Sequence, residues 1–321
     1  MKRGLFLKTA AITGIAAASY LAVGNYFYDF ALKVKGEKDF EDEEADPEKN
    51  PAIDSEVEAA AQEADRLFLK ENPPVERHII SPDFKKLRLS ASFYPNKETS
   101  HKYAILFHGY TGSNEEMLRW VRGFSKKNFH VLTPDFRGHG QSEGNYIGMG
   151  WPDRFDILAW IDAIIEEDSK AEIVLLGLSM GAAAVMMASG ETLPNNVKVI
   201  VEDSGYSTVK KVFSHQLDEI FGLPAFPIMN AANTMTKLRA GYALFQASAI
   251  KQIKKSQTPI LFIHGKDDTF VPFRMLDDLY NVARVEKEKL VVPGAGHGES
   301  IMVAPQLYWR TVWDFVDRFF E

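Results

Sequence analysis

The sequence contains no cysteine among its 321 residues. A disulfide, a thiolate metal ligand and a thiol nucleophile are therefore excluded, and the redox compartment is left open. An excess of basic residues is also lacking, because 44 acidic side chains outnumber 37 basic ones and give a formal net charge of -7. This balance argues against nucleic acid, and against an anionic membrane surface, as the main partner of the folded part.

Two binding motifs are missing as well. The charged segment over residues 37–50 has no EF-hand spacing, which argues against a calcium site. The glycine-punctuated loop over 135–142 does not end in the Gly-Lys-Ser/Thr of a nucleotide-binding loop. We interpret it as a structural loop tied down by an ion pair between Asp135 and Arg137, and we expect neither a metal ion nor an organic cofactor.

The first 35 residues indicate where in the cell the protein is located. Three basic residues lie within the first eight, and the uncharged stretch over 9–28 would form a helix of about 30 Å, which matches a bilayer core. We expect 1–35 to be a membrane anchor that holds the rest of the chain outside the cytoplasm, at the cell membrane. A cleaved export signal ending near 22–24, which would give a secreted protein, and a packed helix of a cytosolic protein are the alternatives.

Residues 36–75 are expected to form an acidic spacer followed by one helix. The spacer over 37–50 has almost no apolar side chain and cannot bury surface. Apolar residues at helical spacing, from Val57 to Phe68, predict a helix over 54–70 with Asp54 or Ser55 as its N-cap. We expect this helix to pack on the following domain or beside its site.

Residues 76–321 have the pattern of one α/β domain. Alternating segments at 76–81 and 86–94 predict an antiparallel hairpin. Short apolar runs then recur between helical stretches, which predicts a mostly parallel sheet with helices on both faces. These runs lie at 103–107, 130–134, 173–176, 197–201, 260–263 and 289–292.

Three helical segments complete this expectation. The segment over 208–252 breaks the strand rhythm, which predicts a small helical cap. An amphipathic helix over 153–167 is expected to bury Phe155, Leu158, Ile161 and Ile165, listed here as its apolar stripe. A last helix, over 306–320, should cover one face of the sheet.

The segment over 173–184 carries the strongest chemical signal. An apolar β-branched run meets Gly177-Leu178-Ser179-Met180-Gly181 and continues into small helix formers, which predicts a strand, a sharp turn and a helix. Larger side chains at the two glycines would collide with the neighbouring strand and helix. Ser179 would then stand above the sheet as a nucleophile, beside the first amides of the helix.

Other polar residues follow neighbouring strands. In a parallel sheet, sites form at the carboxyl ends of the strands. His108-Gly109-Tyr110 lies at one such end, where the amide of Tyr110 is a candidate oxyanion donor beside that of Met180, and His108 is a supporting residue rather than a base. Later strands end at Asp203, at Asp267-Asp268 and at His297.

Together these residues resemble the α/β-hydrolase superfamily, and specifically its bacterial esterase and serine-aminopeptidase-like members with a short cap. The resemblance covers roughly residues 76–321. It is carried by four segments: the His108-Gly109 turn, Asp135-x-Arg137-Gly138-His139-Gly140-x-Ser142, Gly177-x-Ser179-x-Gly181, and Asp268-x-x-Val271-Pro272 with Gly296-His297. The chain order of nucleophile, acid and base agrees with that fold.

The resemblance implies an α/β-hydrolase fold with a Ser179, Asp268 and His297 triad and an oxyanion hole at Tyr110 and Met180. Asp267 and Asp203 are the competitors for the acid. It implies hydrolysis of a small carboxylic ester through an acyl-enzyme, with aminopeptidase-like cleavage of amides and acyltransferase or thioesterase activity as alternatives.

A surface-tethered binding protein without turnover is the alternative from another class. The turn His-Gly-Tyr-Thr departs from the His-Gly-Gly-Gly type, so esters of bulky alcohols are not implied.

Overall fold

The computed structural model describes residues 2–34, 50–98 and 100–320, and most of the acidic spacer at 37–50 lies outside them. Its centre is an eight-stranded sheet in the order β1-β2-β4-β3-β5-β6-β7-β8, in which β2 alone runs antiparallel to its neighbours. The strands are β1 (Val75–Ile80), β2 (Arg88–Tyr94), β3 (Lys102–Phe107), β4 (His130–Pro134), β5 (Glu172–Leu178), β6 (Val197–Asp203), β7 (Ile260–Gly265) and β8 (Lys287–Val292). The predicted hairpin and the predicted parallel runs are therefore confirmed.

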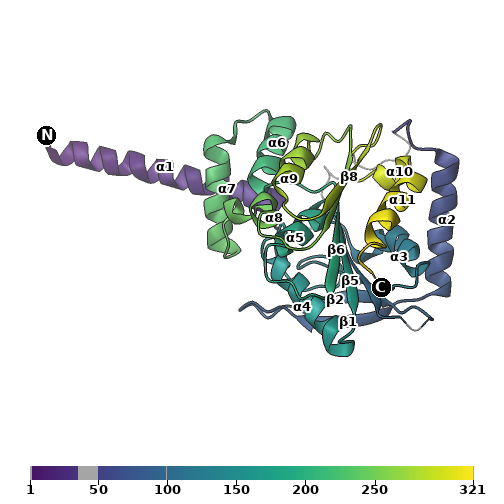
Figure 1. Cartoon of the computed structure of the whole chain (residues 1–321). Helices are drawn as coiled ribbons and strands as arrows, with labels where there is room; N and C mark the ends of the chain where they lie inside the picture. Colours follow the sequence, from purple (N-terminus) through teal and green to yellow (C-terminus); the bar gives the residue numbers. More distant parts are fainter. Residues whose placement is uncertain (1, 35–49, 99, 321) are drawn as a thin grey trace.

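Helices cover both faces of this sheet (Figure 1). One layer contains α4 (Asp153–Glu167), α5 (Met180–Ala188), α8 (Ala249–Ile253) and α9 (Arg274–Val282), and the other contains α3 (Leu118–Ser125), α10 (Ser300–Val303) and α11 (Pro305–Val316). Side chains alternate along a strand. In β3, Ile105 and Phe107 accordingly enter the first core, whereas Ala104 and Leu106 enter the second.

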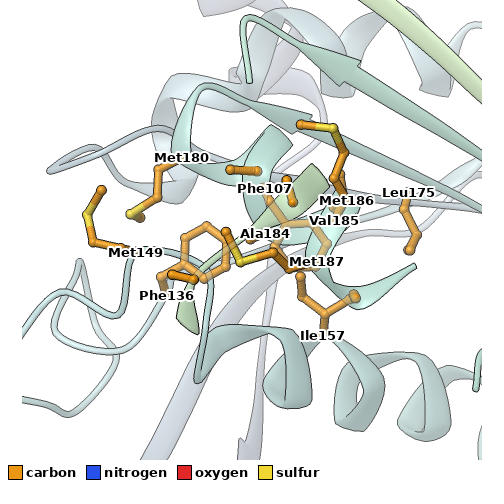
Figure 2. Close-up of a cluster of buried hydrophobic side chains, with 14 of the residues drawn as sticks. Phe107, Phe136, Met149, Ile157, Leu175, Met180, Ala184, Val185, Met186 and Met187 are labelled. Atoms are coloured by element: carbon orange, nitrogen blue, oxygen red, sulfur yellow. The ribbon is translucent and has the colours of Figure 1, made fainter. Parts of the chain in front are cut away.

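Every residue of helix α5 is buried. Figure 2 shows its side chains Val185, Met186 and Met187 among those of the neighbouring strands, loops and α4. A helix that is apolar all round belongs in the interior of a protein. This burial fixes the start of α5, and with it the residue that precedes the helix, Ser179.

The segment predicted as a cap contains α6 (Val209–Phe221), α7 (Ala225–Arg239), the 3-10 turn η2 (Leu244–Gln246) and then α8. Glycine at the end of α6 is in the left-handed conformation, with φ 61° at Gly222, which suits a residue without a side chain. Helix α7 lies alongside α1 (Lys2–Ala31), the long N-terminal helix whose first part projects from the body of the molecule (Figure 1).

The C-terminal part of α1, which includes the end of the expected membrane span at 9–28, packs on the folded domain. Tyr28 and Leu32 are buried in the core, and Tyr20 is within hydrogen-bonding distance (3.2 Å) of Thr234 of α7. One side of this part of α1 therefore contacts the folded domain, while Leu21 (42%) and Tyr26 (55%) stay exposed. In the described part of the chain, no helix combines the length and the apolar character that crossing a membrane requires.

Helix α2 (Ser55–Glu71) begins at the predicted N-cap, where the Asp54 carboxylate accepts hydrogen bonds from the amides of the first turn. The helix packs on the domain as expected. Phe68 contacts the second core and lies beside the ring of Tyr94, whereas Val57 is 47% and Leu67 is 43% exposed. Carboxylates add to this contact. Both Glu58 and Asp65 bind Arg119 of α3, at 2.6 Å and 3.1 Å.

Two details of the packing around α4 also correct the sequence interpretation. Phe155 is 40% exposed, and the buried apolar stripe of α4 consists of Ile157, Trp160, Ile161 and Ile164, listed in chain order. Arg137 does not pair with Asp135. Its side chain is fully buried and donates to Asp156 of α4 from both Nε (2.9 Å) and Nη2 (2.6 Å).

This buried arginine predicts a large stability effect. Arg137 is also 2.7 Å from Asp83 and 3.5 Å from Asp153, so Arg137→Met would leave three carboxylates without their cation. We expect the free energy of unfolding near pH 7 to fall by about 3–5 kcal/mol, measured by urea denaturation.

The loss of unfolding free energy in Arg137→Met should be smaller near about pH 5. Burial raises the pKa of Asp153 and Asp156, so the folded variant binds protons that the unfolded chain releases, and stability rises as the pH falls. Arg318→Met is the control, because Arg318 pairs with two exposed carboxylates at the surface and should cost about 0–1 kcal/mol. Equal losses in both variants would contradict the prediction.

Candidate active site

Ser179 occupies the sharp turn between β5 and α5 with φ 54° and ψ -111°, a conformation that residues other than glycine rarely adopt. The turn is tight on both sides. A Cβ at Gly177 would lie 2.2 Å from the carbonyl carbon of Gly181, and one at Gly181 would lie 2.2 Å from the oxygen of Phe107. The Ser179 amide donates to the carbonyl oxygen of Asp203 on β6 (2.8 Å), which fixes the turn above the sheet.

Three side chains that are distant in sequence meet at this turn. The Ser179 hydroxyl is 2.7 Å from His297 Nε2, and His297 Nδ1 is 2.8 Å from Asp268 Oδ2. A carboxylate only accepts, so the proton sits on Nδ1 and the ring donates to Asp268. Nε2 is then left as the acceptor of the Ser179 proton. Asp268 and His297 arrive from the loops that follow β7 and β8.

The carboxylate of Asp268 is buried and fully engaged. Its Oδ1 accepts from the Val271 amide (2.8 Å), and its Oδ2 also lies 3.1 Å from Nε2 of His264. Burial opposes ionisation of Asp268. The neighbouring His297 and His264 outweigh it and hold the pKa of Asp268 well below its usual range.

His264 is a residue whose part in the site sequence reasoning missed. It is fully buried at the end of β7, and its Nε2 faces both Asp268 and the carbonyl oxygen of Val271 (2.8 Å), which requires Nε2 to be protonated. Its Nδ1 has no hydrogen-bond partner among the described residues. The available signal was the repeated His-Gly pair at two strand ends, 108–109 and 264–265.

The other candidate acids lie elsewhere. Asp267 accepts from the amide of Gly294 (3.0 Å). Asp203 is fully buried and accepts from the Ser204 hydroxyl (3.0 Å), and its burial raises the pKa of Asp203 to about 6. The imidazole hydrogen bond from His297 therefore goes to Asp268.

The turn after β3 lies beside the serine. A Cβ at Gly109 would be 3.6 Å from the Cβ of Ser179, so this backbone approaches the nucleophile closely. Met180 is the first residue of α5, where an amide has no partner within the helix. His108 donates from Nδ1 to the Gly109 oxygen (2.8 Å) and accepts from the Phe136 amide, and burial lowers the pKa of His108 to about 4. It is a neutral support of the turn.

Ser179 lies where two different cavities meet. The first, the narrow cavity, has a volume of about 80 Å³ and is almost wholly apolar. It is formed by α1 together with α6, α7 and the turn at Tyr110. The second is wide, about 760 Å³, and contains His297 together with charged side chains of α2 and α3 such as Asp65 and Arg119. Within the described residues, no cluster of three or more acidic or histidine side chains could hold a metal ion.

Comparison with known proteins agrees with this geometry. The alpha/beta hydrolase family matches residues 104–311. The uncharacterized protein YqkD of Bacillus subtilis is 27% identical over 215 residues, which are 67% of this chain and 70% of that protein.

Two solved structures share the fold. An esterase of Pyrococcus furiosus, Pf2001, superimposes with a TM-score of 0.64 at 24% identity, over 78% of this chain and 93% of its own. Est1E of Butyrivibrio proteoclasticus, solved with ferulic acid, gives 0.62 at 20% identity, over 76% and 98%. The family match spans more than half of the sequence and includes Ser179, Asp268 and His297. The chain belongs to the alpha/beta hydrolase family.

Proposed function

We propose that this protein is a serine hydrolase that cleaves carboxylic esters through an acyl-enzyme. The observation that carries the proposal is the unbroken chain of short hydrogen bonds from Ser179 to His297 and from His297 to Asp268. A serine hydroxyl is a weak nucleophile unless an adjacent base takes its proton and a third group orients that base.

The mechanism follows from the directions of these hydrogen bonds. Ser179 attacks the carbonyl carbon while its proton passes to Nε2 of His297. The new imidazolium is stabilised by Asp268, which stays ionised because its pKa is depressed. The amides of Tyr110 and Met180 would receive the tetrahedral oxyanion. His297 then returns the proton to the departing alcohol, and a water molecule repeats the sequence on the acyl-enzyme.

Esters are favoured over amides and thioesters as substrates by the structural neighbours, two of which are described as esterases by name or title. Their identity to this chain is below 25%, so they support the choice of substrate only by analogy. Aminopeptidase-like or acyltransferase activity would use the same three residues. A binding protein without turnover would not require the strained turn or the aligned imidazole.

The test combines an active-site label with a substrate panel. A fluorophosphonate should label the full-length protein at Ser179, because only an activated serine reacts quickly. Acyl esters, aminoacyl amides and acyl thioesters are then compared by kcat/KM. We expect the ester to be turned over fastest. A folded protein that is neither labelled nor active would support the binding alternative, and a preference for aminoacyl amides would support the peptidase alternative.

A further inference from the structure

We infer that the N-terminal helix α1 forms one wall of the acyl-binding pocket, and that the acyl group bound there is an aliphatic chain. This inference rests on the proposed function and deepens it. The helix lies outside the matched family region, which starts at residue 104. The narrow cavity at Ser179 is lined by Phe27, Phe30, Ala31 and their neighbours on α1.

The second half of α1 is held firmly enough to shape a pocket. Arg239 of α7 donates from Nη1 to Asn25 (2.7 Å) and to Asp29 (2.7 Å). Gly24 permits close approach of the two helices, because a Cβ there would lie 2.4 Å from the oxygen of Ala231. The backbone of α1 is thereby fixed at charged, polar and close-packed contacts with α7.

Contacts with the site itself complete the wall. The rings of Phe27 and Phe30 pack edge-on against Phe221 of α6, with centroids 5.5 Å and 5.2 Å apart. The Tyr110 hydroxyl donates to the carbonyl oxygen of Ala31. One residue thus joins α1 to the turn that carries a proposed oxyanion donor, so a change in α1 reaches the reacting carbonyl.

The position of the base assigns the two halves of the ester. His297 must reach the leaving oxygen to return its proton, and His297 lines the wide cavity but not the narrow one. The alcohol therefore leaves through the wide cavity. The acyl group occupies the narrow cavity, whose small volume and apolar wall suit an aliphatic chain rather than a charged group.

The experiment measures kcat/KM of the full-length protein for p-nitrophenyl acetate, butyrate, hexanoate, octanoate and benzoate. Each methylene that the pocket buries should raise kcat/KM about fourfold, which corresponds to about 0.8 kcal/mol per methylene. Ala31→Leu should fill the pocket and lower the hexanoate-to-acetate ratio of kcat/KM by about 10-fold or more, since about three methylene equivalents are displaced. Phe27→Ala should move the preference toward longer chains.

A matched control keeps the outcome unambiguous. Ala17→Leu makes the same change on the exposed, projecting part of α1 and should leave the chain-length profile unchanged. The inference fails if both pocket variants keep the wild-type profile, if both lose acetate and hexanoate turnover equally, or if benzoate is preferred over hexanoate in the wild type. Absence of ester turnover and of fluorophosphonate labelling in the wild type would instead refute the proposed function.

Discussion

Ser179→Ala is expected to lower kcat for ester hydrolysis by about 10⁴ to 10⁶. The hydroxyl is the atom that would bond to the acyl group, and it lies 2.7 Å from Nε2 of His297, which would take its proton. The oxyanion donors and both cavities remain in the variant. We therefore expect a residual rate above that in water, KM within a few-fold of wild type, and complete loss of fluorophosphonate labelling.

Ser207→Ala is the matched control for this substitution. Ser207 is a buried serine in the loop after β6, and its hydroxyl has no hydrogen-bond partner among the described residues. Removing that hydroxyl makes the same chemical change close to the site, so kcat should stay near that of wild type. A Ser179→Ala enzyme that retains more than about one hundredth of the wild-type kcat would contradict the assigned nucleophile.

Asp268→Asn is expected to lower kcat by about 10⁴ while the protein stays folded. An amide is almost the same shape as a carboxylate but carries no charge. It would no longer stabilise the imidazolium, and its NH₂ group can face Nδ1 of His297, which would place the ring proton on Nε2, opposite Ser179. The Val271 amide strengthens this expectation, because it donates to Oδ1 and therefore favours the oxygen of the introduced side-chain amide at that position. The measurement is kcat for a p-nitrophenyl ester.

Asp267→Asn tests which of the two adjacent carboxylates, Asp267 or Asp268, is the acid that orients His297. Asp267 is exposed and accepts one amide hydrogen bond, from Gly294, so its loss of charge should change kcat no more than a few-fold. If Asp267→Asn were the damaging change and Asp268→Asn the mild one, the assignment of the acid would be reversed. Comparable losses in both would mean that the loop, rather than one carboxylate, supports His297.

Local sequence patterns were sufficient for much of the fold and for the candidate residues. The sharp turn at Ser179 could be predicted because the residues that it requires lie within five positions, with a glycine two residues before and two residues after the serine. The parallel sheet is readable because each buried strand is a short apolar run that ends at a polar turn. Residues at those ends had to lie on one edge of the sheet, which is why Asp268 and His297 could be listed before their distances were known.

The errors came from contacts between segments far apart in the chain. A stripe of apolar residues in α4 fits helical spacing at Phe155 as well as at Ile157. The buried face is set by Arg137, which draws Asp153 and Asp156 inward, and no local pattern reveals that pairing. The same reason explains why the ion pairs of Glu58 and Asp65 with Arg119 were not predicted for α2.

The packing of the N-terminal helix depends on distant contacts in the same way. Its alanine and glycine content and its aromatic cluster suit a bilayer and a packed helix equally well, so composition could not distinguish them. Its contacts with the domain involve residues far along the chain, among them Arg239, which binds Asp29, and Phe221, which packs on Phe27.

The meeting of a narrow and a wide cavity at Ser179 has a consequence for the order of events. On the proposed mechanism, a bound acyl chain fills the narrow cavity, so the departing alcohol and the incoming water both pass through the wide cavity beside His297. The alcohol must leave the wide cavity before deacylation can begin. A second alcohol would compete with water for the position beside His297. The side chains that line the wide cavity, Arg66 and Glu115 among them, therefore govern whether the acyl group is hydrolysed or transferred to that alcohol.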